Sequence, residues 1–158
     1  MPWCVFLFLA LAGDWPQFLG PTRNGVSPET VNWPPAALWR KDVGEGFAAP
    51  VVANGKAILF YRSNGKEIID CLDAASGAKI WTYDYPTTYR DDFGFDEGPR
   101  SAPSIADGAV FTFGAQGVLT AIDFATNGCG FVPRSRRFQK PQEPSSHAKR
   151  FPSGNEWR

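Results

Sequence analysis

Short apolar runs alternate with tight-turn residues through the middle of this chain. The pairs Asn54-Gly55 and Asp107-Gly108 stand between such runs. Both pairs favour a type I′ hairpin turn, because each central position of that turn needs a positive φ. The pattern predicts consecutive short antiparallel strands. We expect strands near residues 48–53, 56–61, 67–72 and 79–84, then near 101–106, 109–114 and 117–122, with a last strand from residue 130.

The same pattern occurs twice, in residues 47–81 and in residues 100–131. The matched segments are Val51–Gly55 with Ser104–Gly108, Ile58–Phe60 with Val110–Thr112, and Leu72–Gly77 with Ile122–Asn127. A repeat of about 50 residues made of four strands and three tight turns is typical of one β-propeller blade. Leu38–Asp42 resembles the last strand of another blade, which in a closed ring would pair with the far end of the chain.

The sequence therefore predicts an all-β fold, a truncated or partial β-propeller with about two four-stranded antiparallel blades and a disordered C-terminal tail. The predicted divisions are a signal peptide over 1–12, an N-terminal leader with an outer strand over 13–46, a blade over 47–98, a second and incomplete blade over 99–131, and a disordered basic tail over 132–158.

Residues 72–81, Leu-Asp-Ala-Ala-Ser-Gly-Ala-Lys-Ile-Trp, resemble the blade signature of the pyrroloquinoline-quinone (PQQ)-like propeller repeat. In such a motif Asp73 accepts backbone N–H bonds across the turn and Gly77 supplies a positive φ. Trp81 then packs from the outer strand against the neighbouring blade. The second unit keeps Asp123 and has Asn127 in place of the glycine, because asparagine tolerates the left-handed region. The resemblance covers roughly Asp14 to Gly128.

The resemblance implies a fold more than an activity, because the repeat occurs both in quinone-dependent dehydrogenases and in exported scaffold proteins. No catalytic, cofactor or metal residue is predicted, since the chain has no adjacent cysteine pair of the kind that covers the quinone. PQQ and calcium would belong only to an intact parent protein. We expect a non-catalytic scaffold or protein-interaction module with a protein partner. The alternative is a remnant of a PQQ-dependent dehydrogenase without an intact active site.

The apolar run from Trp3 to Ala12 ends in Ala10-Leu11-Ala12, a small-x-small pattern typical of signal cleavage. The run is far shorter than the roughly 20 residues that span a bilayer, so no stable membrane span is expected. It predicts export to the periplasm or the cell exterior, although no Lys or Arg precedes it. A buried N-terminal strand is the alternative.

The two parts of the chain differ in net charge. Residues 129–158 carry seven Lys or Arg and two Asp or Glu, whereas the other residues carry nine basic and fourteen acidic groups. The tail lacks any apolar period and is predicted to be disordered. Our first hypothesis for the abrupt change is an interrupted reading frame, and no nucleic-acid partner is then expected. A basic arm that binds polyanions is the second interpretation.

Candidate chemistry is sparse. The acidic residues Asp91, Asp92, Asp96 and Glu97 offer oxygen ligands for calcium, but their spacing favours a solvated loop between blades. His147, in the tail, is the only histidine, which argues against a Ser-His-Asp triad. Cys71 and Cys129 lie in separate segments and are expected to be inert thiols.

Overall fold

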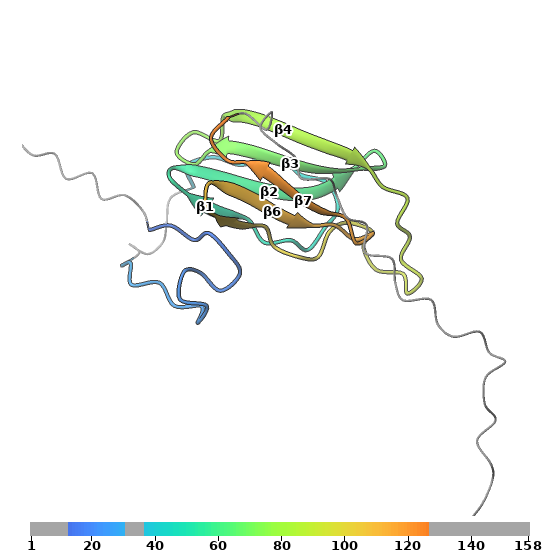
Figure 1. The fold of residues 1–158 in the computed structure, drawn as a ribbon, viewed down its shortest axis with the longest axis horizontal. Helices are drawn as coiled ribbons and strands as arrows, with labels where there is room; N and C mark the ends of the chain where they lie inside the picture. Colours follow the sequence, from blue (N-terminus) through green and yellow to red (C-terminus); the bar gives the residue numbers. More distant parts are fainter. Residues whose placement is uncertain (1–12, 31–36, 127–158) are drawn as a thin grey trace, which may run out of the picture.

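The computed structural model describes residues 13–30 and 37–126, and this part of the chain is all-β without a helix. Two antiparallel sheets follow chain order (Figure 1). The first sheet contains β1 (Val51–Ala53), β2 (Lys56–Ser63), β3 (Lys66–Asp73) and β4 (Lys79–Pro86). The second contains β5 (Ser104–Ala106), β6 (Ala109–Phe113) and β7 (Leu119–Asp123). This open pair of sheets confirms the prediction of a partial, propeller-like all-β fold.

The hairpin turns form at the predicted pairs. Asn54 and Gly55 have φ values of 49° and 70°, and Asp107 and Gly108 have 49° and 74°. In the first repeat the Ala74 N–H donates to the Gly55 carbonyl at 2.8 Å. In the second, the Phe124 N–H donates to the Gly108 carbonyl at 2.8 Å. The two repeats therefore fold the same way around the same hydrogen bond.

The strand register corrects one detail of the sequence alignment. Val51 pairs with Ile58 in the first sheet, and Ser104 pairs with Phe111 in the second. Ile58 therefore corresponds to Phe111, and the match of Ile58 with Val110 was wrong by one residue. Neighbouring positions of this strand are apolar on both faces, so hydrophobicity alone does not fix the register.

The two sheets pack face to face around one core. The first sheet contributes Val51, Ala53, Ile58, Phe60, Ile69, Cys71 and Trp81, and the second contributes Val110 and Ile122, followed by Phe124. We call the side of each sheet that meets the other its core face, and the opposite side its outer face. Burying an aliphatic side chain of this size contributes about 1.5–3 kcal/mol.

The leader lies along the free edges of the two first strands. Trp15 and Val52 exchange two backbone hydrogen bonds of 2.7 and 3.0 Å, and the Ile105 N–H donates to the Pro16 carbonyl at 2.7 Å. The Asn54 N–H also donates to the Asp14 carboxylate at 2.9 Å. The leader thus links β1 to β5.

Some predicted strands differ from the observed ones. The strand expected at Leu38–Asp42 was wrong: the segment is irregular, because within the described ranges no strand lies beside it to form a ladder. Strands β1 and β5 each begin at the residue that follows a proline, Pro50 or Pro103, which is later than predicted. Proline donates no ladder hydrogen bond, so the ladder starts only after it. The predicted signal peptide, the strand from residue 130 and the tail lie outside the described residues.

Candidate functional site

The predicted motif residues form two equivalent turns. The Asp73 carboxylate accepts from the Ser76 N–H at 2.8 Å and from the Ser76 hydroxyl at 2.7 Å. These bonds hold the pKa of Asp73 below its usual range. Gly77 closes the turn with a φ of 71°, and a Cβ there would meet the Trp39 ring.

In the second turn, the Asp123 carboxylate accepts from the Thr126 N–H at 2.7 Å, the Thr126 hydroxyl at 2.7 Å and the Ala125 N–H at 2.9 Å. The Thr126 bonds lower the pKa of Asp123 in the same way. Asn127 lies outside the described residues. Both turn carboxylates are therefore engaged in holding backbone, which leaves them a structural role.

Trp81 lies in the core between the sheets. It stands on β4, is only 5% exposed, and belongs to the cluster that contains Ile122 and Phe124 of the second repeat. Cys71, its cross-strand partner, is fully buried, and burial raises the pKa of its thiol to about 11.

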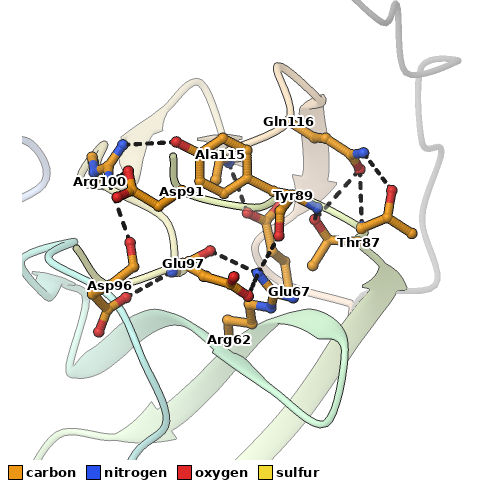
Figure 2. A network of polar contacts seen from close by, with 12 residues as sticks. Arg62, Glu67, Thr87, Tyr89, Asp91, Asp96, Glu97, Arg100, Ala115 and Gln116 are labelled. Atoms are coloured by element: carbon orange, nitrogen blue, oxygen red, sulfur yellow. Dashed lines mark hydrogen bonds and ion pairs between the residues drawn. The ribbon is translucent and has the colours of Figure 1, made fainter. Parts of the chain in front are cut away.

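The acidic loop between the sheets is held by two arginines (Figure 2). The Arg62 guanidinium pairs with the Glu97 carboxylate at 2.9 Å and donates to the Tyr89 and Glu97 carbonyls at 2.8 and 3.1 Å. Arg100 pairs with Asp91 at 2.8 Å and donates to the Tyr89 hydroxyl at 3.0 Å.

Three of the four carboxylates considered for calcium are engaged in such contacts. The Arg100 guanidinium, then the Phe95 N–H, lower the pKa of Asp91, and Asp96 accepts from the Gly98 N–H at 2.6 Å. Asp92 is exposed. Across residues 13–30 and 37–126, no group of three or more His, Cys, Asp or Glu side chains is arranged to hold a metal ion. The loop is a structural connection between the sheets.

Two polar side chains with buried oxygen atoms, those of Glu67 and Tyr85, lie between the core faces near this loop. Glu67 is fully buried and accepts from the Ala115 N–H at 2.7 Å. Its second oxygen and the Tyr85 hydroxyl lie against Gly114, and neither has a hydrogen-bond partner among the described residues. Burial, then the nearby Glu67, raise the pKa of Tyr85. A side chain at position 114 would collide with both groups.

A second buried carboxylate lies on the outer face of the first sheet. The Asp70 carboxylate accepts from the Thr82 hydroxyl at 2.6 Å and from the Tyr61 hydroxyl at 3.0 Å. It also pairs with the Lys41 ammonium, whose nitrogen lies 3.3 Å from the carboxylate oxygen. Burial and the bond to Asp70 raise the pKa of Tyr61 to about 12.

Sequence reasoning missed Glu67 and Asp70, although one signal was present. Both are acidic residues inside the strand Lys66–Asp73, whose other interior residues are apolar. A charged residue inside a buried strand needs a partner, which marks it as part of a polar cluster.

The outer face of the first sheet is hollowed by a cavity of about 420 Å³. Its floor is formed by Ala57, Leu59 and Tyr61 of β2, which alternate with the core residues of that strand. Its other wall is the segment that carries Trp39, Lys41, Val43 and Ala48.

Among residues 13–30 and 37–126, nothing covers the apolar outer face of the second sheet. Phe111, Phe113 and Leu119 are 38%, 44% and 40% exposed. They lie on neighbouring strands, since Phe111 pairs with Ala121 and Phe113 with Leu119.

Comparison with protein-family models and with curated proteins finds no match to this chain. The PQQ-like resemblance therefore stays a prediction from the motif residues. Within the described part of the chain, no helix has the length and hydropathy needed to cross a membrane.

Proposed function

We propose that this chain is an exported propeller segment of the PQQ-like repeat type that acts as a non-catalytic scaffold or protein-interaction module. The observation that carries the proposal is the apolar outer face of the second sheet, where three large side chains remain exposed on adjacent strands. Apolar surface gathered in this way is typical of a binding surface.

The polar groups support the same conclusion. Asp73 and Asp123 accept hydrogen bonds within their own turns, and Asp91 and Glu97 pair with arginines of the inter-sheet loop. Each of these carboxylates stabilises the backbone conformation around it. A dehydrogenase would instead need its carboxylates gathered around a ligand cavity, and none of these four lines the cavity on the first sheet.

Export agrees with the place where the leader joins the fold. Asp14 follows the predicted cleavage point after Ala12 by two residues and already caps the Asn54 N–H of the first hairpin. Removal of residues 1–12 would therefore leave the leader contacts with β1 and β5 intact. This supports a periplasmic or extracellular location.

The enzyme alternative is tested by adding PQQ and calcium to the purified full chain. We expect no shift of the quinone absorbance and no dye-linked dehydrogenase signal, while a known quinoprotein loaded in parallel gives both. A saturable absorbance shift with this chain would overturn the non-catalytic assignment.

A further inference from the structure

The segment before β1 lies against the first sheet, as β4 lies against the second. Its sequence Leu38-Trp39-Arg40-Lys41-Asp42 matches the β4 sequence Ile80-Trp81-Thr82-Tyr83-Asp84: the second and last residues are identical, and the first is aliphatic in both. The Trp39 indole donates to the Ala74 carbonyl at 2.9 Å and lies against Gly77, both in the turn after β3.

Trp81 packs on the second repeat, although its indole N–H has no hydrogen-bond partner among the described residues. It packs in one cluster with Phe124, the residue that corresponds to Ala74. Each tryptophan therefore stands on a segment that contacts the following sheet, and only the Trp81 segment is a strand.

The two outer segments differ in their backbone pairing. Strand β4 forms a ladder with β3, in which Trp81 lies opposite Cys71 and Asp84 opposite Ile68. Within the described ranges, residues 37–42 form no ladder. Within the same ranges, no strand lies beside the outer edge of β7. The described part of the chain thus contains an irregular outer segment that belongs to no sheet and a second sheet that has no fourth strand.

The two outer faces also correspond to the two halves of the existing core. By register, Phe111, Phe113 and Leu119 on the outer face of the second sheet correspond to Ile58, Phe60 and Ile69 on the core face of the first. In the same way, Ala57 and Leu59 on the cavity floor of the first sheet correspond to the buried residues Val110 and Thr112 of the second. The outer faces are therefore complementary to each other, as the core faces are.

We propose that the partner of this surface is a second copy of the chain, bound head to tail. Residues 37–42 of one copy add antiparallel to the outer edge of β7 of the next copy. The phenyl rings of Phe111 and Phe113 then enter the 420 Å³ cavity on the first sheet of the donor copy. The inference rests on the proposed function, since it names the partner of the interaction module.

The contact joins unlike surfaces, so it repeats from copy to copy and gives a ring or an open chain rather than an isolated symmetric dimer. An unpaired strand edge is the usual site of such addition. The β3–β4 ladder also fixes the expected register: Val118 corresponds to Ile68 and Asp42 to Asp84, so Asp42 of one copy should face Val118 of the next.

The test joins two singly substituted full-length chains in a background with Cys4 and Cys129 replaced by serine. One carries Asp42→Cys and the other, distinguished by a mass tag, carries Val118→Cys. Under mild oxidation we expect a disulfide-linked heterodimer when the two are mixed. The control partner Leu38→Cys changes an exposed residue four positions out of register, and it should give at least tenfold less heterodimer with Val118→Cys, because a disulfide needs Cα atoms within about 7 Å.

Equal cross-linking by Asp42→Cys and Leu38→Cys would overturn the proposed register. A solution measurement covers the case in which the substitutions disturb the fold. The unmodified chain should show a mass above that of the monomer in sedimentation, rising with concentration, and Phe113→Asp should return it to the monomer with an unchanged far-UV spectrum.

If the unmodified chain is monomeric at every concentration, the proposal that a second copy is the partner is wrong. This holds whatever covers the outer edge of β7 within the same chain. The non-catalytic assignment would then stand or fall separately on quinone binding.

Discussion

The carboxylates of Asp73 and Asp123 each close a three-residue turn by accepting the N–H and hydroxyl of a Ser or Thr. Their pKa values are lowered in the folded chain, chiefly by Ser76 and Thr126. The unfolded reference for an aspartate is about 3.9. A lowered folded pKa means that the stabilisation is present above this value and is lost as the pH falls through the folded pKa.

We therefore predict that unfolding by urea becomes easier below about pH 4, and that Asp73→Ala with Asp123→Ala weakens this acid dependence while lowering stability at neutral pH. Asp92→Ala, at an exposed position of the inter-sheet loop, is the matched control and should leave both unchanged. An unaltered acid dependence in the double variant would show that the turn carboxylates do not stabilise the fold.

At the scale of the strand, Trp81 is the residue of β4 that packs in the core with Ile122 and Phe124 of the second repeat. Because it is 5% exposed within the core, Trp81→Ala should lower the free energy of unfolding by about 3–5 kcal/mol, and Trp81→Phe by less. Phe93→Ala removes a ring that is 85% exposed and should change stability little. Chemical denaturation of the three variants measures the difference, and similar midpoints for Trp81→Ala and Phe93→Ala would contradict the packing of β4 on the second sheet.

The sequence allowed the strands of both repeats to be predicted, because Asn-Gly and Asp-Gly pairs fix where a hairpin turns. It did not reveal that Leu38–Asp42 is irregular, since a strand depends on a neighbour that local sequence does not specify. The one-residue error at Val110 has a similar cause, because this strand is apolar on both faces. At the site, the turn carboxylates followed from the motif. Glu67 gains its partner from a distant segment, and Asp70 gains its partners from the two neighbouring strands and from Lys41.

At the scale of the molecule, the described residues form two stacked sheets whose outer faces have no neighbouring sheet (Figure 1). Propellers protect such faces by placing another blade against each one. Here the leader links the first strands and the arginine-held loop links β4 to β5, so the pair of sheets is joined at two separate places.

The central claim is that residues 47–81 and 100–126 fold into equivalent sheets that stack through their core faces. Nuclear Overhauser contacts in an isotope-labelled full chain test it directly. We predict cross-strand contacts between Val51 and Ile58 and between Ser104 and Phe111, together with contacts from the Trp81 indole to the methyl groups of Ile122. Helical chemical shifts across residues 47–84, or cross-strand contacts without any contact between Trp81 and the second repeat, would contradict the account.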